Sequence, residues 1–167
     1  MEIALDPTIP TYAGGLGILA GDTLRSAADL GIPMVAVSLV HRKGHFRQHL
    51  DAQGNQSEGP AAWSPEQLLE PMRPILTLTV AGRPVHVRAW RYLIEGITGH
   101  VVPVYLLDTA LQENTTFDRT LTDHLYGGDA YYRLCQEVVL GIGGVGILPK
   151  LGHHHIGSYH MNDGQSA

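Results

Sequence analysis

The sequence has 167 residues, of which 44% are hydrophobic and 16% charged, so it can form a packed core and is not typical of a disordered chain. Eleven lysines and arginines against 16 aspartates and glutamates give a formal net charge of −5, which argues against a nucleic-acid partner bound by bulk charge. Cys135 is the single cysteine, which excludes an internal disulfide and a multi-cysteine zinc site.

Two further exclusions concern the membrane and the compartment. No apolar run approaches the roughly 18 residues that a membrane-spanning helix needs, so we expect no membrane partner. The first ten residues lack a basic region followed by an apolar stretch, and a lone cysteine fits a reducing compartment. We therefore expect a cytoplasmic protein.

The first predicted elements form half of an α/β unit. A glycine-rich turn at residues 14–17 precedes a helix that ends before Gly31 and Pro33. Residues 34–40 are a continuous apolar run of strand length, as in a parallel strand covered on both faces. The apolar positions that recur at helical spacing are Leu16, Leu19, Ala20, Leu24, Ala27, Ala28 and Leu30.

The middle of the chain has a different pattern. Residues 41–60 are polar and contain glycine, so we expect a surface excursion, after which Ser64 and Pro65 mark a helix start. Residues 75–107 contain three apolar, partly alternating segments separated by turn residues, which predicts an antiparallel β meander whose last strand could rejoin the main sheet.

Two helices are predicted after the meander, a short one at residues 121–125 and a longer one from Asp129 to about Leu148, stopped by Pro149. Residues 1–5 resemble the end of a buried strand, and residues 156–167 resemble a strand that runs into a loop and a further helix. We therefore expect the chain to be a piece of a longer enzyme, with a complete small protein as the alternative.

The glycine-rich turn is the first candidate site. Gly14, Gly15, Leu16 and Gly17 open the first helix, and glycines let the backbone approach a ligand closely. The unpaired N–H groups and the positive end of the helix dipole suit an anion such as phosphate. The alternative is a glycine-rich turn without a ligand.

The second candidate is the pair Asn162 and Asp163, which follows the predicted strand at residue 156. Ligands of open α/β sheets bind at strand ends, and these side chains could hydrogen-bond to sugar hydroxyls. The alternative is an Asp-Gly turn that caps the next helix.

Three other patterns carry weaker predictions. Gly141, Gly143 and Gly146 match a dinucleotide-binding spacing, but they lie inside a helical pattern, which indicates close helix packing instead. The adjacent histidines of residues 153–155 do not converge on one metal, so we expect a solvated loop and no metal site. The basic segment 41–48 could contact an anionic or sugar ligand, with a solvated loop as the alternative.

Together these segments resemble the α-glucan (glycogen/maltodextrin) phosphorylases, in particular the shorter prokaryotic type. The resemblance covers essentially the whole chain. It is carried in order by the blocks MEIALDPTIPTYAGGLGILAGDTLRSAADLGIPMVAVSL, RKGHFRQHLDAQG, GHVVPVYLLDT, DRTLTDHLYGGD, RLCQEVVLGIGGVG and YHMNDGQSA.

The resemblance implies a fold and an activity. It implies that residues 1–167 are part of the N-terminal Rossmann-like domain of a GT-B glycosyltransferase, with the C-terminal cofactor domain absent. The intact enzyme would cleave α-1,4-glucan with inorganic phosphate and release glucose 1-phosphate with retention at the anomeric carbon. Pyridoxal phosphate would act through its phosphate group, bound to a lysine outside this chain. A homo-oligomer is possible.

The resemblance also assigns roles to residues. Gly14, Gly15, Leu16 and Gly17 correspond to the glycine loop that faces the phosphates and the bound glucose, and Asn162 and Asp163 lie near the sugar subsites. Two departures stand out. Gln165 replaces a common histidine and cannot titrate near pH 7. Ala13 replaces a common Asn or Ser, which removes one polar contact.

Two other functions stay open at this point. A non-catalytic glucan-binding protein could use the glycine turn for binding alone. A nucleotide-sugar glucan synthase also uses a glycine-rich loop in a GT-B fold, although the blocks after residue 100 favour the phosphorylases. We expect the isolated chain to be catalytically inactive because it holds one wall of an active site.

Overall fold

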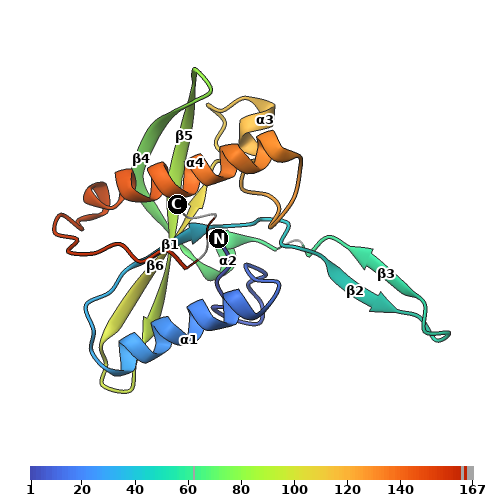
Figure 1. The fold of residues 1–167 in the computed structure, drawn as a ribbon, viewed down its shortest axis with the longest axis horizontal. Helices are drawn as coiled ribbons and strands as arrows, with labels where there is room; N and C mark the ends of the chain where they lie inside the picture. Colours follow the sequence, from blue (N-terminus) through green and yellow to red (C-terminus); the bar gives the residue numbers. More distant parts are fainter. Residues whose placement is uncertain (62, 163, 165–167) are drawn as a thin grey trace.

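A computed structural model describes residues 1–61, 63–162 and 164 (Figure 1). The helices are α1 (Gly15–Asp29), α2 (Pro65–Leu68), α3 (Thr116–Arg119) and α4 (Ala130–Ile147), with a 3-10 turn η1 at Pro149–Leu151. The strands are β1 (Ala36–Leu39), β2 (Arg47–Leu50), β3 (Gln56–Gly59), β4 (Glu70–Val80), β5 (Arg83–Glu95) and β6 (Val101–Asp108).

Four strands form one mixed sheet in the order β1-β6-β5-β4. β4, β5 and β6 pair antiparallel, which confirms the predicted meander with wider bounds, and Ala81 and Gly82 take positive φ values of 48° and 78° in its first turn. β1 pairs parallel with β6, with Ala36 opposite Val104. The meander therefore belongs to the same sheet as the α/β part, and the fold is α/β.

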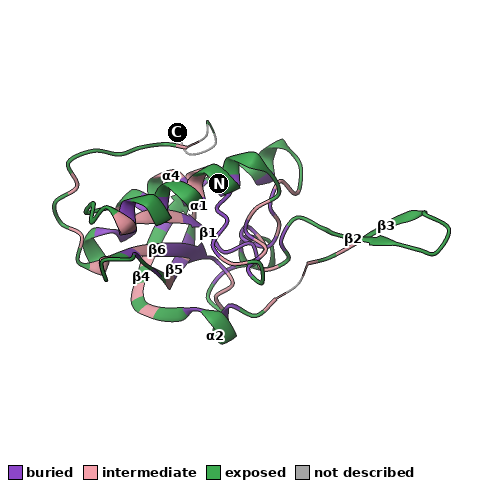
Figure 2. Cartoon of the chain, turned by 90° about the horizontal axis from the view of Figure 1, so that it is seen from below, coloured by how far each residue is buried: buried purple, intermediate pink, exposed green. Residues whose placement is uncertain are grey.

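Helices cover both faces of this sheet, with α4 on one side and α1 on the other (Figure 1). Leu106 and Leu107 of β6 are both fully buried and belong to opposite faces, as expected of a strand covered on both sides. Figure 2 shows that the middle of the sheet is buried, while much of the surface of the helices is exposed. The core on the α4 side includes Leu78, Val87, Leu107, Val139 and Ile147, and the core on the α1 side includes Leu24, Ala28, Trp90, Val104 and Leu106.

The glycines of α4 let this helix approach the sheet. A Cβ atom on Gly143 would lie 3.0 Å from Leu78 Cδ1, and one on Gly146 would lie 3.1 Å from Leu76 Cδ2. The dinucleotide-like spacing is therefore a packing feature inside a helix, as predicted. Asp129 caps this helix by accepting a hydrogen bond of 2.8 Å from the Tyr132 amide, which confirms the predicted helix start.

The excursion after β1 contains an exposed hairpin. β2 and β3 pair antiparallel with each other and not with the main sheet. Figure 1 shows this hairpin projecting away from the rest of the molecule. The predicted surface excursion is thus confirmed for residues 45–58, whereas His41 and Gly44 are buried, and the polar sequence did not indicate the strand pair.

Three predicted elements differ from the structure. Residues 121–125 are turns, and the short helix is α3, capped by Thr115 through the Asp118 amide. Residues 1–5 are buried but not a strand, because Ile3 N–H donates to Thr11 and Ala4 N–H to Gly17. Residues 156–161 form no strand either.

The predicted apolar face of the first helix is also only partly correct. Leu24, Ala27 and Ala28 are buried, but Leu16, Leu19 and Leu30 are exposed. Within the described part of the chain, no helix combines the length and hydropathy needed to span a membrane.

Candidate functional site

The glycine turn opens α1 as the sequence predicts. Gly14 is the N-cap residue in an extended conformation, and the helix begins at Gly15. Gly14, Gly15 and Leu16 are exposed, while Gly17 is buried. This 15-residue helix has no side-chain cap and no acidic residue in its first turn, so its positive end is not neutralised from within the helix.

The four predicted residues have two different environments. A Cβ atom on Gly14 or Gly15 would meet nothing within 4 Å, so open space lies in front of both. A Cβ atom on Gly17 would lie 2.5 Å from Tyr12 Cβ and 3.0 Å from Glu2 Oε2. Gly14 and Gly15 therefore leave room for a ligand, whereas Gly17 leaves room for the protein's own chain.

Glu2 contacts this turn and was missed by the sequence analysis. Its Oε2 atom accepts hydrogen bonds from the Ala13 and Gly14 amides at 2.8 and 2.9 Å, and its Oε1 atom accepts one from the Tyr126 hydroxyl. Burial acts to raise the pKa of Glu2, but these hydrogen bonds outweigh it and hold the pKa below its usual value. The available signal was a lone carboxylate within the apolar segment 1–5, since a buried charge needs partners.

The next three amides of the turn differ from those of Ala13 and Gly14. Among the described residues, the N–H groups of Gly15, Leu16 and Gly17 have no hydrogen-bond acceptor. The first-turn amides of a helix have no acceptor within the helix itself. The turn therefore combines two amides that hold Glu2 with the amides of the exposed residues Gly15 and Leu16, which are available to another group.

Asn162, the other predicted contact, lies beside this turn. Its Nδ2 atom donates to the Leu16 carbonyl at 3.3 Å, which joins residues 146 positions apart in the sequence. Asp163 and Gln165 lie outside the described residues. A cavity of about 720 Å³ lies near the turn. Glu2 and Asn162 line it, together with parts of α1, β1 and α4 and residues 155–161, but none of residues 13–17 does.

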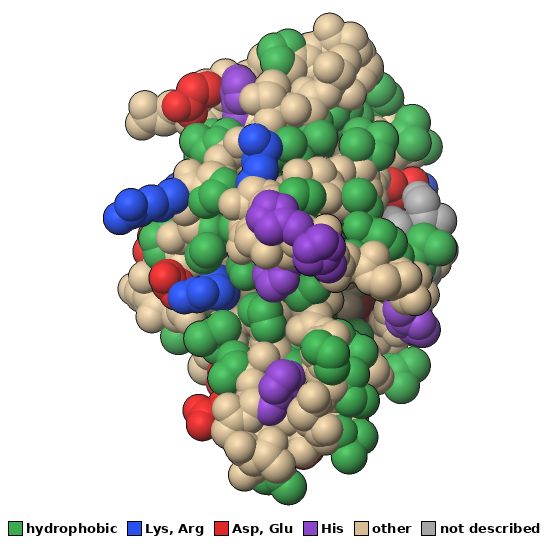
Figure 3. All heavy atoms as spheres, turned by 90° about the vertical axis from the view of Figure 1, so that its left-hand side faces the viewer, with side chains coloured by type: hydrophobic (Ala, Val, Ile, Leu, Met, Phe, Trp, Pro, Cys, Tyr) green, Lys and Arg blue, Asp and Glu red, His purple; other side chains and the backbone are tan. Residues whose placement is uncertain are grey.

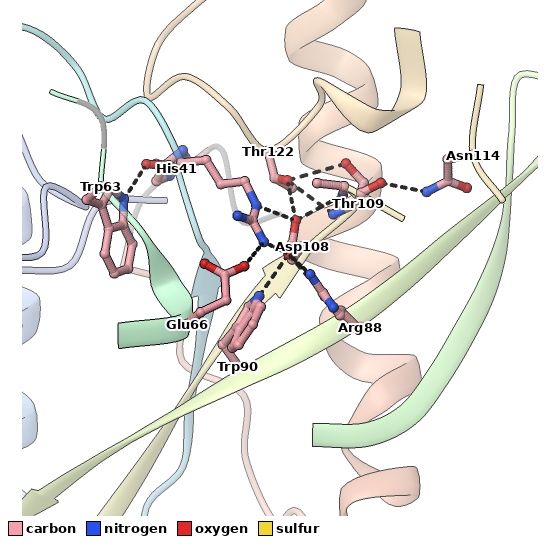
Figure 4. Close-up of polar contacts among 11 residues, drawn as sticks. His41, Trp63, Glu66, Arg88, Trp90, Asp108, Thr109, Asn114 and Thr122 are labelled. Carbon is pink, nitrogen blue, oxygen red and sulfur yellow. Dashed lines mark hydrogen bonds and ion pairs between the residues drawn. The ribbon is translucent and has the colours of Figure 1, made fainter. Parts of the chain in front are cut away.

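A second polar cluster surrounds Asp108 at the end of β6 (Figure 4). Arg42 contacts this fully buried carboxylate at 2.7 Å, Arg88 at 3.1 Å and the Trp90 indole N–H at 2.8 Å. Burial acts to raise the pKa of Asp108, but Arg42 and the other donors outweigh it, so the pKa lies below its usual value. Arg42 also pairs with Glu66 at 3.2 Å.

The Asp108 cluster corrects the prediction for the basic segment 41–48. His41 is buried and not part of a solvated loop, and Arg42 belongs to the cluster. Lys43 pairs with Asp123 at 2.7 Å. The charges of Arg42 and Lys43 are thus paired within the molecule, while Phe46, Arg47 and Gln48 are exposed, and a ligand contact of this segment stays a prediction.

The histidines at 153–155 are only partly solvated. His153 Nε2 lies 3.1 Å from the Tyr105 hydroxyl, while His154 and His155 are exposed. Figure 3 shows histidine side chains gathered on one face of the molecule, among widely spread hydrophobic ones. In the part of the chain that is described, no three His, Cys, Asp or Glu side chains come close enough to hold a metal ion.

This chain could hold pyridoxal phosphate as a Schiff base only through one of its lysines. The sequence has two, Lys43 and Lys150. Lys43 forms its ion pair with Asp123, and Lys150 lies in η1 after α4. Neither lysine lines the cavity beside the glycine turn. The residues present therefore do not form a cofactor-lysine site at this turn.

Comparison with known proteins identifies close sequence relatives. The chain is 37% identical to maltodextrin phosphorylase of Thermococcus litoralis over 100% of its length, and 39% identical to glycogen phosphorylase of Mycobacterium tuberculosis over 99%. It is 35% identical to glycogen phosphorylase of Aquifex aeolicus over 97%. No protein-family model matches the chain.

The matched region is a small part of each relative. The chain spans 20% of the length of the Thermococcus and Mycobacterium proteins and 24% of the Aquifex protein. Identity of 35–39% over essentially the whole chain establishes the relationship. The chain is thus a homologue, over its full length, of one segment of the maltodextrin and glycogen phosphorylases.

Proposed function

We propose that this chain forms one wall of the active site of an α-glucan phosphorylase. The reaction of the whole enzyme is cleavage of α-1,4-glucan by inorganic phosphate to give glucose 1-phosphate. The observation that carries the proposal is the exposed turn before α1, where Gly15 and Leu16 present amides without an acceptor among the described residues. The names of the relatives support the same reaction.

The turn would act by binding and stabilising negative charge. N–H groups at the start of a long helix attract phosphate, and the helix dipole adds to this attraction. Because Gly14 and Gly15 carry no side chain, phosphate oxygens can reach the backbone. Amides held in place before the reaction stabilise charge that develops on phosphate in the transition state. Asn162 and Asp163 would hydrogen-bond to glucose hydroxyls.

The remaining parts of the active site would come from other sequence of the intact enzyme. Pyridoxal phosphate would be held there, because the two lysines of this chain do not line the cavity beside the turn. The parallel β1–β6 pair with helices on both faces supports assignment to the N-terminal Rossmann-like domain of a GT-B fold. We expect the isolated chain to be inactive and the enzyme to be cytoplasmic.

A chimeric enzyme tests this function directly. The chain replaces the matching segment of the Mycobacterium tuberculosis glycogen phosphorylase, and release of glucose 1-phosphate from maltodextrin and phosphate is measured. We expect activity from the chimera and none from the purified chain supplied with pyridoxal phosphate. Turnover by the chain alone would show that no second wall is needed and would contradict the proposal.

Glycine variants of the chimera then test the turn itself. Gly15→Ala adds a methyl group in open space, so it should leave the fold intact while crowding the ligand and lowering kcat/KM about tenfold or more. Gly59→Ala in the projecting hairpin is the matched control, since its Cβ would be in ordinary contact with His49 at 3.9 Å. Equal activity of the two variants would exclude the turn from the site.

A binding measurement tests the alternative function. Tighter binding of ADP-glucose than of glucose 1-phosphate by the chimera would favour a glucan synthase.

A further inference from the structure

Glu2 is a buried carboxylate that the proposed function does not yet use. It is 8% exposed, although a charged side chain is rarely buried without partners. Its partners are the Ala13 and Gly14 amides on one oxygen and the Tyr126 hydroxyl on the other. Glu2 thus joins the glycine turn to the loop before α4, which lies 124 residues away from it in the sequence.

The backbone that follows Glu2 is fixed by hydrogen bonds to two other segments. Ile3 N–H donates to the Thr11 carbonyl at 2.9 Å, and the Thr11 hydroxyl donates back to the Ile3 carbonyl at 2.6 Å. Ala4 N–H donates to the Gly17 carbonyl at 2.9 Å, and Arg25 Nη2 donates to the Leu5 carbonyl at 2.6 Å. The carboxylate is therefore held against the turn by a rigid segment.

Tyr126 holds the other carboxylate oxygen from a strained position. Its φ is 59°, in the left-handed region that a residue with a large side chain rarely adopts. Its ring also packs edge-on against His45, with 6.1 Å between the ring centroids. Backbone strain of this kind persists only where surrounding contacts enforce it, and it is common at functional sites.

The absence of a side chain at Gly17 makes room for this arrangement. A Cβ atom there would lie 3.0 Å from Glu2 Oε2 and 3.2 Å from Glu2 Cβ. The turn therefore has an inner side, formed by Ala13 and Gly14 amides bound to Glu2, and an outer side, where Gly14 and Gly15 border open space.

We propose that Glu2 is a positioning residue for the ligand-binding turn. Its carboxylate fixes the Ala13 and Gly14 amides, and this holds the following amides of Gly15 and Leu16 in the orientation that binds the sugar phosphate. The inference rests on the proposed function of the turn. In this role Glu2 acts through the Ala13 and Gly14 amides.

The Glu2 carboxylate has two opposite effects on phosphate binding, and the test must distinguish them. A negative charge near the turn repels phosphate, so its removal alone would strengthen anion binding. Loss of positioning would weaken binding, because amides that are free to move must be ordered again when the ligand binds. Tyr126→Phe separates the two effects, since it loosens the carboxylate without changing the charge at neutral pH.

The test uses the full 167-residue chain and glucose 1-phosphate as the probe, followed by amide signals in two-dimensional NMR. We expect the Gly15 and Leu16 amide signals to shift on titration. Glu2→Gln should weaken binding about tenfold and Tyr126→Phe about threefold, and both should speed hydrogen exchange of the Ala13 and Gly14 amides. Asp6→Asn is the matched control: it removes the same charge from the same segment, and affinity should change less than about twofold.

Each outcome bears on a different statement. Unchanged or tighter binding by Glu2→Gln, with the Gly15 and Leu16 shifts retained, would overturn the positioning role and leave the proposed function standing. Absence of those shifts in the unmodified chain would contradict the proposed function of the turn, and the positioning role would fall with it. If Glu2→Gln does not fold, Tyr126→Phe decides: binding equal to that of the unmodified chain overturns the inference.

Discussion

The Asp108 cluster and the glycine turn gather polar groups in opposite ways. At Asp108 both carboxylate oxygens have several donors, and its arginine partners are largely covered. At the turn, Glu2 takes the Ala13 and Gly14 amides, while the amides of Gly15 and Leu16 keep no acceptor among the described residues. The cluster has the stronger charges, but the turn has the unused hydrogen-bonding capacity.

This difference indicates which polar groups can bind a ligand. A saturated cluster gains nothing from a ligand, because each new contact would replace one that already exists. Unpaired amides beside open space gain a partner when a ligand binds. The comparison predicts that changes at Asp108 reduce stability, whereas changes on the outer side of the turn reduce binding.

The largest expected effect comes from Asp108→Asn. The change leaves Arg42 and Arg88 beside a neutral buried group, and breaking a buried ion pair from one side costs about 3 kcal/mol or more. Urea unfolding of the chain measures this loss. Glu66→Gln removes an exposed partner of Arg42 and should cost under about 1 kcal/mol. Similar losses from the two variants would show that the cluster is not a buried structural unit.

The next effect concerns the pH dependence of stability. Burial lowers the pKa of His41, next to Arg42, from 6.5 to about 3. Between these values the unfolded chain binds a proton that the folded chain does not, so stability is full above pH 6.5 and falls as the pH decreases. Below pH 6.5, one such group lowers the free energy of unfolding by about 1.4 kcal/mol per pH unit, or by about 2 kcal/mol between pH 7 and pH 5.

His41→Asn supplies the control for this prediction. Asparagine tolerates the positive φ of 43° at this position and does not titrate in this range. Burial and the nearby His154 also lower the pKa of His153, which adds a loss of the same sign, so the assignment depends on the difference between the two chains. Urea unfolding at pH 7, 6 and 5 should show a flatter curve for the variant. Parallel curves would contradict a neutral buried His41.

The sequence predicted most of the fold because its patterns are local. The period-two alternation of the meander and the Asp129 cap are set by neighbours along the chain, and both are confirmed. The pairing of β1 with β6 was open, because it depends on residues about 68 positions apart, such as Ala36 and Val104. The helix predicted at residues 121–125 was wrong, because Thr115 provides an earlier cap.

The candidate site was predicted in part for the same reason. The glycine turn could be found because its residues are adjacent. Glu2 stood out only as a lone carboxylate in an apolar segment, and its contacts with the turn and with Tyr126 arise only when distant segments pack. The solvated-loop alternative for the basic segment was wrong at Arg42, since the partners of Arg42, Glu66 and Asp108, lie 24 and 66 residues further along the chain.

A smaller effect separates the inner side of the turn from the outer side. Gly17→Ala places a methyl group 2.5 Å from Tyr12 Cβ, so the packing of the N-terminal segment must shift. Overpacking of this kind costs about 1–3 kcal/mol, which urea unfolding would detect. Gly21 is not a useful control, because its Cβ would lie 2.1 Å from the Ala4 carbonyl oxygen. Unchanged stability of Gly17→Ala would contradict the close approach of Glu2 to the turn.

The smallest expected effect has the opposite sign and completes the comparison. Gly15→Ala introduces a side chain at the first helical position, where a Cβ atom has no neighbour within 4 Å. Alanine also restricts the unfolded chain more than glycine does, so stability should rise by about 0.5 kcal/mol. If glycine at this exposed position lowers stability, packing does not explain why a glycine is found there. If Gly15→Ala stabilises the chain and also lowers the affinity for glucose 1-phosphate, the glycine serves the approach of the ligand. If Gly15→Ala destabilises the chain, the fold requires this glycine, and its presence no longer supports ligand binding on the outer side of the turn.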